Sequence, residues 1–380
     1  MRAEDSLNII KDHDILTHLG DEYEKYLDAV IPPIFMNSLH VTPKSAIDSD
    51  TPREYFYGRV SNPTVKVFER KIAALERADK ALAFGSGMAA ITTAILACVK
   101  SGDHIVCVET AYGPTRAFIT EELCGKFNIE VTFVTGDDIN QFEAAIKPNT
   151  ALLYLESPSS MVFILQDLEK IASLAKARGI KTIVDNSWAT PLYQKPITHG
   201  IDLSVHTASK YMGGHSDIIA GIVAGNEPLI GRVQSLRERY GGILGPMEAW
   251  LATRGVRTLA VRLAAHGASA STIAQRLEAH SHVRAVNYPG LQSHPQHALA
   301  LRQMMGFTSP LSFELNCSGA EAREFVKRLA WYNVGPSWGG FESMVTVPYG
   351  ESTLVRIHVG LEDVETLWGD LEQSLNSIKK

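Results

Sequence analysis

A lysine in an unusual setting is the first residue of this chain that could do chemistry. Lys210 lies in the stretch Ser-Val-His-Thr-Ala-Ser-Lys-Tyr-Met-Gly-Gly-His-Ser-Asp (204–217), just after a short apolar run. Two hydroxyl residues, Thr207 and Ser209, precede it. Ligands bind at strand ends in α/β sheets, and a lysine beside packed apolar surface readily loses its charge and becomes a nucleophile. An ordinary surface lysine is the alternative, so the assignment depends on the surrounding residues.

An aspartate one apolar run earlier supports a chemical role for Lys210. Asp185 ends the run in Ile-Val-Asp-Asn-Ser-Trp-Ala (183–189). A lysine that binds an aldehyde and an acid that holds a pyridine nitrogen are the pair that pyridoxal phosphate requires. Together, Asp185 and Lys210 predict a pyridoxal phosphate site at one edge of a sheet.

A glycine-rich loop could bind the phosphate of that cofactor. Phe84-Gly85-Ser86-Gly87-Met88-Ala89-Ala90 follows an apolar run and opens a helical stretch, so the N–H groups of Gly87 and Met88 could point at an anion. The same spacing satisfies the G-x-G-x-x-A pattern of dinucleotide-binding folds, with Glu109 as the ribose-binding acid. A dinucleotide-dependent oxidoreductase is therefore a second hypothesis, although it gives Asp185 and Lys210 no role.

Three further side chains are suited to the same cofactor. Tyr112, in Glu-Thr-Ala-Tyr-Gly-Pro-Thr, follows the run that ends at Glu109, and its ring could stack on a planar cofactor. Tyr57 and Arg59 offer a phenol and a guanidinium, which suit phosphate. Because these two precede the first clear helix, we expect them to reach the site of a neighbouring subunit.

The composition is that of a globular enzyme acting on a small molecule. The chain has 380 residues, 45% of them hydrophobic, and a formal net charge of −6, which leaves no basic surface for nucleic acid. No apolar run is long enough to span a membrane, and the amino terminus (MRAEDSLNIIKDHDI) carries acidic residues where a signal peptide would not. Four scattered cysteines favour a cytoplasmic protein. The histidines near residues 280–297 lack the carboxylate or thiol neighbours that a metal site needs.

The order of apolar and helical stretches predicts an α/β fold with a mostly parallel sheet. We expect an extended arm over residues 1–60, a large cofactor-binding domain over 61–245 and a smaller α+β domain over 246–380. The large domain begins with a helix capped by Asn62, and 247–279 forms one long helical region. The expected strands of the large sheet are 81–84, 104–109, 129–134, 151–156, 182–185, 203–207 and 218–224, and those of the small domain are 282–287, 310–316 and 354–359.

Several linked motifs make the chain resemble the Cys/Met metabolism family of pyridoxal-phosphate enzymes. They are Tyr-Gly-Arg-x-x-Asn-Pro-Thr, Gly-Ser-Gly-Met-Ala-Ala, Asp-Asn-Ser-Trp-Ala, Ser-Lys-Tyr-x-x-Gly-His-Ser-Asp, Ser-Trp-Gly-Gly-Phe-Glu-Ser and Arg-Ile-His-Val-Gly-Leu-Glu-Asp. The resemblance implies the fold-type-I (aspartate-aminotransferase-like) architecture, with a mostly parallel seven-stranded sheet, and a cytoplasmic homotetramer whose active sites are shared between chains.

The resemblance also implies a role for each candidate residue. Lys210 would bind the cofactor covalently, Asp185 would keep its ring nitrogen protonated, and Tyr112 would stack on the ring and assist proton transfer. Arg356 would bind the substrate α-carboxylate. The implied phosphate ligands are Gly87, Met88, Thr207 and Ser209, with Tyr57 and Arg59 from a partner subunit, and the implied substrate contacts are Tyr57, Ser337, Trp338 and Arg356.

Within this family the sequence favours a cystathionine β-lyase, which would make homocysteine, pyruvate and ammonia. Trp338 stands where many relatives have Leu, Trp188 follows Asp-Asn-Ser, and Pro114 stands where methionine γ-lyases usually carry a cysteine. Against this, Pro336 replaces the Tyr of β-lyases, and Tyr57–Thr64 is closer to the general family. A γ-lyase, a cystathionine γ-synthase or an O-acylhomoserine sulfhydrylase is the alternative.

Overall fold

A seven-stranded mixed sheet forms the centre of the larger part of the molecule. In the computed structural model, which describes residues 11–47, 51 and 53–378, its strand order is β1-β7-β6-β5-β4-β2-β3. Only β7 runs antiparallel to its neighbours. The strands are β1 (Lys80–Phe84), β2 (His104–Val108), β3 (Glu130–Val134), β4 (Thr150–Glu156), β5 (Lys181–Asp185), β6 (Leu203–His206) and β7 (Gly221–Gly225).

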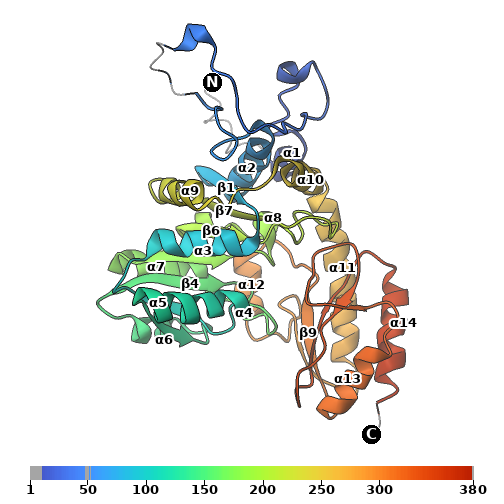
Figure 1. Cartoon of the computed structure of the whole chain (residues 1–380). Coiled ribbons are helices and arrows are strands. Elements are labelled where there is room, and N and C mark those ends of the chain that lie inside the picture. Colours follow the sequence, from blue (N-terminus) through green and yellow to red (C-terminus); the bar gives the residue numbers. More distant parts are fainter. Residues whose placement is uncertain (1–10, 48–50, 52, 379–380) are drawn as a thin grey trace.

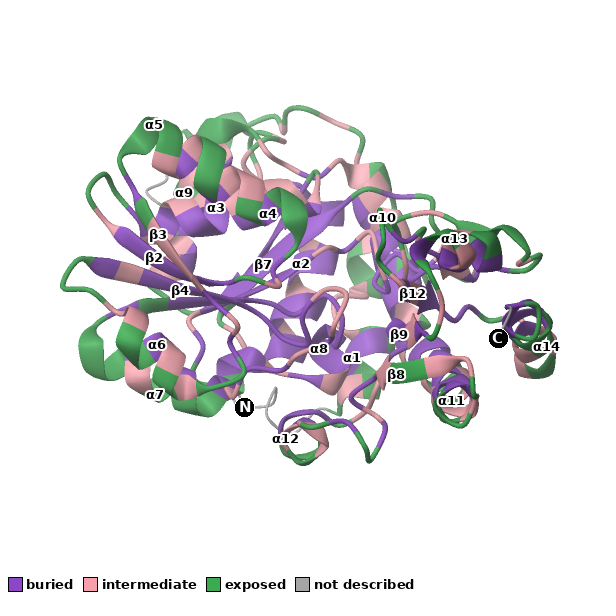
Figure 2. Ribbon diagram, turned by 90° about the horizontal axis from the view of Figure 1, so that it is seen from below, coloured by how far each residue is buried: buried purple, intermediate pink, exposed green. Residues whose placement is uncertain are grey.

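Helices cover both faces of this sheet, so its central strands are buried throughout (Figure 2). α3 and α9 lie on one face, and α6 and α7 on the other. Burial on both faces explains why the strands read as continuous apolar runs rather than as alternating patterns. The helices of this part are α3 (Gly87–Cys98), α4 (Gly113–Ala117), α5 (Gly125–Phe127), α6 (Ile139–Ala145), α7 (Leu168–Arg178), α8 (Thr190–Tyr193) and α9 (Leu229–Tyr240), and a π-helical segment, Phe118–Cys124, joins α4 to α5.

The helix α2 (Pro63–Glu76) starts as the sequence predicts. The Asn62 side chain accepts hydrogen bonds from the N–H groups of Thr64 and Val65, and Pro63 occupies the first turn, where its missing N–H costs nothing. Arg77 ends the helix in the left-handed conformation with φ 59°. This end brings Glu76 under the central strands, where it is fully buried.

The amino-terminal segment contains regular structure that the sequence does not predict. α1 (Asp12–His18) packs on α2 of its own chain and buries Ile15 and Leu16. Beyond two short 3-10 turns, Tyr23–Tyr26 and Lys44–Ala46, the chain runs in loops that project from the body (Figure 1). Residues 1–10, the first part of the predicted arm and of the acidic amino terminus, lie outside the described residues.

The carboxyl-terminal part is built on a second sheet with the order β10-β11-β12-β9-β8. α11 contacts β8, β9 and α14, and α14 contacts α13, so helices pack beside this sheet (Figure 1). The strands are β8 (Val283–Asn287), β9 (Leu311–Leu315), β10 (Asn333–Val334), β11 (Met344–Val345) and β12 (Leu354–His358), and the helices are α10 (Pro246–Arg257), α11 (Leu259–Glu278), α12 (His297–Gln303), α13 (Gly319–Lys327) and α14 (Val364–Leu375).

The predicted fold class, with its mostly parallel seven-stranded sheet, is confirmed. The predicted helical region over 247–279 is confirmed and consists of two helices, because the chain breaks at Thr258 (φ −104°, ψ 7°) between α10 and α11. The Arg262 guanidinium donates to the Gly255 carbonyl at 2.6 Å and binds the end of α10. Within the described part of the chain, no helix is both long enough and apolar enough to cross a membrane.

Candidate active site

A cavity of about 310 Å³ lies where the strands of the large sheet end. Its walls come from the segments after β1, β2, β4, β5 and β6 and from residues 336–338 and β12 of the carboxyl-terminal part. This is the edge at which α/β folds bind ligands. The structure brings ten of the predicted site residues together here: Gly87, Met88, Tyr112, Asp185, Thr207, Ser209, Lys210, Ser337, Trp338 and Arg356.

Lys210 has the properties of a reactive amine. It lies in the turn after β6, and its Nζ is 2.7 Å from Ser337 Oγ and 5.3 Å from the Trp338 ring centre. Burial lowers the pKa of the Lys210 amine to about 8, and the Arg356 charge lowers this pKa while Asp185 opposes the change. A substantial fraction of the amine is therefore neutral near neutral pH, as a nucleophile or base requires.

Asp185, the last residue of β5, is 6% exposed. The Ser187 N–H donates to its Oδ1 at 3.0 Å. Burial raises the pKa of the Asp185 carboxyl, whereas the Ser187 hydrogen bonds and the charges of His206 and Lys210 lower it. A buried carboxyl at a cavity wall is suited to hold a protonated ring nitrogen.

The start of α3 provides an anion site. The first intrahelical hydrogen bond runs from Ala90 N–H to Ser86 O, and the Ser86 hydroxyl accepts from Ala89 N–H. The N–H groups of Gly87 and Met88 therefore precede the hydrogen-bonded turns of the helix, where anions bind. A Cβ added at Gly87 would lie 2.4 Å from Thr207 Oγ1, so only glycine lets the helix start lie against this hydroxyl.

Ser209 lines the cavity, but its hydroxyl also has a structural contact. It accepts from the Ala220 N–H at 2.9 Å and lies 3.2 Å from the Ala220 carbonyl, to which it donates. These bonds fix the turn that carries Lys210 against the segment before β7. A role of Ser209 in phosphate binding remains a prediction.

The carboxyl-terminal part supplies the other wall. Arg356, on β12, donates from one guanidinium nitrogen to the Pro336 carbonyl at 2.6 Å. Burial lowers the pKa of Arg356 somewhat, and Glu156 and Tyr112 oppose the change. The centre of the Trp338 ring lies 5.7 Å from the ring centre of Tyr211, the residue that follows Lys210. Thus Ser337, Trp338 and Arg356 face Lys210 from across the cavity.

Glu156 is a cavity residue that the sequence analysis did not select. Its Oε2 accepts from the Tyr112 N–H, and its Oε1 from the Ser160 N–H, each at 2.7 Å. Burial raises the pKa of Glu156 to about 8, and the charge of Asp185, its partner across β4 and β5, adds to the rise. A signal was present, because Glu156 ends an apolar strand just as Asp185 does.

Tyr57 and Arg59 do not line the cavity of their own chain. Tyr57 is 41% exposed, and the Arg59 guanidinium lies 5.4 Å from its ring centre and donates to the Glu238 carbonyl. The structure therefore keeps these two residues together but outside the group formed by the other ten.

The residues of the cavity fit pyridoxal phosphate. The start of α3 and Thr207 could hold the phosphate, Asp185 could hold the ring nitrogen, and the Lys210 amine could take the aldehyde. The half-exposed Tyr112 ring, 46% accessible, lies at the wall where a flat ring could stack on it. Among the described residues, no group of three or more His, Cys, Asp or Glu side chains could hold a metal ion.

Comparison with known proteins agrees with this geometry. The model of the family described as Cys/Met metabolism PLP-dependent enzyme matches residues 14–376. The chain belongs to this family. It is 37% identical to the cystathionine β-lyase of Lactococcus lactis subsp. cremoris (strain MG1363), over 94% of this chain and 97% of that one. It is 36% identical to the cystathionine γ-lyase of Bacillus subtilis (strain 168), over 97% of this chain and 100% of that one.

A solved structure confirms the fold. The crystal structure of MetB from Corynebacterium glutamicum superposes with a TM-score of 0.93 at 33% identity, covering 97% of this chain and 99% of that one. The chain is thus a PLP-dependent enzyme, and the predicted class, a carbon–sulfur lyase, is confirmed. The dinucleotide hypothesis is wrong: Glu109, its ribose-binding acid, is exposed and does not line the cavity.

Proposed function

We propose that the chain is a cystathionine β-lyase, which cleaves cystathionine to homocysteine, pyruvate and ammonia. The observation that carries the proposal is the position of Ser337 and Trp338 directly against Lys210. The bulky indole there narrows the space beside the reacting amine, and a tryptophan at this position favours a β-lyase because many relatives have Leu there.

Lys210 would move the proton that the reaction requires. Bound pyridoxal phosphate supplies an electron sink that stabilises negative charge at the substrate Cα. The Lys210 amine takes the proton from Cα and gives it to the leaving sulfur as the Cβ–S bond breaks. Homocysteine leaves, and one water converts the remaining three-carbon unit to pyruvate and ammonia.

Other residues would orient the substrate and the cofactor. Arg356 would bind the α-carboxylate through a paired hydrogen bond, which fixes the Cα–H bond for cleavage. Asp185 would keep the ring nitrogen protonated, and Tyr112 would stack on the ring and take a proton from the incoming amino group. Gly87, Met88, Thr207 and Ser209 would hold the phosphate.

We further propose a cytoplasmic homotetramer in which Tyr57 and Arg59 complete the site of a neighbouring subunit. Two observations support this. Both residues lie outside the cavity of their own chain, and the same loop region exposes apolar side chains, among them Leu27, Val30 and Val41. Apolar side chains gathered on one projecting segment are typical of a subunit interface.

A γ-elimination is the second candidate, because the Bacillus subtilis relative is a cystathionine γ-lyase of nearly equal identity. The product distinguishes the two, since β-elimination of cystathionine releases pyruvate and γ-elimination releases 2-oxobutyrate. We expect pyruvate, and its formation should be lost in Lys210→Ala together with the visible absorption of the bound cofactor. Release of mainly 2-oxobutyrate would overturn the β-lyase assignment, and full turnover by Lys210→Ala would overturn the mechanism.

The variant Trp338→Leu tests the observation behind the proposal. Removing the indole widens the cavity beside Lys210, so the share of pyruvate among the keto acids should fall. Phe341→Leu, an exposed aromatic outside the cavity wall, is the matched control and should leave the share unchanged. An unchanged share in Trp338→Leu would show that the indole does not select the bond that breaks.

A further inference from the structure

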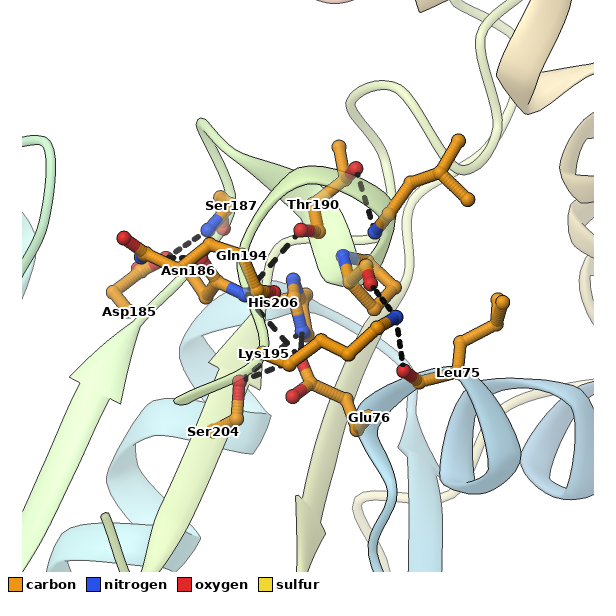
Figure 3. A network of polar contacts seen from close by, with 12 residues as sticks. Leu75, Glu76, Asp185, Asn186, Ser187, Thr190, Gln194, Lys195, Ser204 and His206 are labelled. Carbon is orange, nitrogen blue, oxygen red and sulfur yellow. Dashed lines mark hydrogen bonds and ion pairs between the residues drawn. The ribbon is translucent and has the colours of Figure 1, made fainter. Parts of the chain in front are cut away.

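A buried polar cluster lies next to the cofactor site and has no place in the mechanism above. We call it the Glu76 cluster; its members are Glu76, Asn186, Gln194, Ser204 and His206 (Figure 3). All five side chains are at most 1% exposed. Burying polar groups is costly unless they are mutually satisfied, so this cluster requires an explanation.

Glu76 is the centre of the cluster. Its Oε1 accepts from His206 Nε2 at 2.5 Å, from Ser204 Oγ at 2.8 Å and from Asn186 Nδ2 at 3.3 Å. Through these three contacts Glu76 joins α2 to Asn186, Ser204 and His206 at the ends of β5 and β6.

The Glu76 cluster contacts the ends of β5 and β6 on the face of the sheet opposite the cofactor site. Asp185 pairs in register with Val205, so the side chains of the next residues along, Asn186 and His206, project from the other face. The Asn186 N–H donates to the Val205 carbonyl at 2.8 Å, and the Asn186 side chain donates to the Gln194 carbonyl at 2.9 Å. Asn186 directly follows Asp185, just as His206 directly precedes Thr207.

His206 also acts on Asp185 through space. Its charge is among those that lower the pKa of Asp185 against the effect of burial. The next cation behind the sheet, Lys195, is already paired with Asp12 at 2.9 Å and donates to the Leu75 and Pro191 carbonyls. The groups whose charges lower the pKa of Asp185 are thus His206 and Lys210.

We propose that Glu76 and His206 are positioning residues for the cofactor ring: from the reverse face of the sheet they fix the ends of β5 and β6 and, with them, the position of Asp185. Neither residue lines the cavity, so both act through Asp185. The inference rests on the proposed contact between Asp185 and the ring nitrogen.

The test compares two ligands on the full-length enzyme after removal of its cofactor. One is pyridoxal phosphate and the other is its 1-deaza analogue, in which carbon replaces the ring nitrogen. In Glu76→Gln, which keeps the shape but replaces one carboxylate oxygen with an amide nitrogen, the hydrogen bonds that fix Asp185 are weakened, so the dissociation constant of pyridoxal phosphate should rise about tenfold. That of the analogue should change much less. Equal weakening of both ligands, or of neither, would overturn the proposal.

Glu69→Gln is a matched control, because Glu69 is a second buried acid on α2. It pairs with Arg237 at 2.6 Å and is 3% exposed, but it contacts β1 rather than β5 or β6. This variant should lower the melting temperature without changing the ratio of the two dissociation constants. A change of the ratio as large as that in Glu76→Gln would show that any lost buried charge has the effect, and would overturn the proposal.

Two more variants complete the experiment. His206→Asn alone should change the ratio in the same direction, and the double variant with Glu76→Gln should be no worse than the more affected single one, because the residues act as a unit. Full additivity of the two single effects on the ratio would contradict this.

Asp185→Asn distinguishes the proposed contact of Asp185 with the ring nitrogen from the proposed role of the Glu76 cluster. If Asp185→Asn leaves the ratio unchanged, the contact with the ring nitrogen is wrong. If the ratio changes in Asp185→Asn but not in Glu76→Gln, only the role of the cluster is refuted.

Discussion

The reactivity of Lys210 toward an acylating reagent should follow a titration centred near pH 8. Burial lowers its pKa from 10.5 to about 8, so at pH 7 roughly a tenth of the amine is neutral, against about one part in 3,000 for an unperturbed lysine. The neutral amine is the reactive form, so the rate should rise about tenfold per pH unit below the midpoint and level off above it. At pH 7 the buried setting thus gives an advantage of about 300-fold in neutral amine.

The assay is competitive labelling with acetic anhydride after removal of the cofactor, with peptide mass spectrometry to follow Lys210. Labelling of Lys126, which is exposed on the surface, monitors the dose of reagent. Because the Arg356 charge disfavours the protonated amine, Arg356→Gln should move the midpoint upward. Because Asp185 favours it, Asp185→Asn should move the midpoint downward. A midpoint near that of an ordinary lysine, a downward shift in Arg356→Gln or an upward shift in Asp185→Asn would refute the reasoning.

Two other changes test the opposite ends of the cavity. Arg356→Lys keeps the charge but loses the paired hydrogen bond to the α-carboxylate. KM should therefore rise about 10- to 100-fold with a smaller fall in kcat, as measured by steady-state kinetics. An unchanged KM would show that the substrate α-carboxylate binds elsewhere. Gly87→Ala puts a Cβ 2.4 Å from Thr207 Oγ1, so the helix start must move, which should destabilise the protein by about 1–3 kcal/mol and weaken cofactor binding. Thermal melts and equilibrium dialysis measure both, and normal affinity would contradict the role of this close contact.

The large sheet could be predicted from the sequence because its signals are local. β4, β5 and β6 are apolar runs that end in a polar residue, as in 182–185, and Gly179 (φ 68°) marks the end of α7. The break at Thr258 could not be predicted in this way, because no proline or run of glycines interrupts 247–279. It depends on tertiary contacts: a Cβ at Gly255 would lie 2.2 Å from the Met212 carbonyl, so α10 packs directly on the loop after Lys210.

The residues of the site likewise divide into those with a local sequence signal and those that only tertiary packing brings together. Asp185 and Lys210 could be found because they lie in local motifs, and all the predicted residues except Tyr57 and Arg59 line one cavity. Glu156 could have been found by the rule that selected Asp185. Glu76 and His206 carry no such signal, because 130 positions separate them and only the packing of α2 under β6 brings them into contact. Long-range contacts of this kind are properties of the fold rather than of any segment.

The cavity draws its two walls from distant stretches of the chain. The candidate groups for the cofactor come from the ends of β1, β2, β5 and β6 and the segments that follow them, whereas Ser337, Trp338 and Arg356 come from the carboxyl-terminal sheet and the loop beside it. Substitutions in this second wall can therefore alter which sulfur compound is accepted while the chemical machinery opposite stays intact. Such a separation lets related enzymes keep one reaction centre and diverge in substrate specificity.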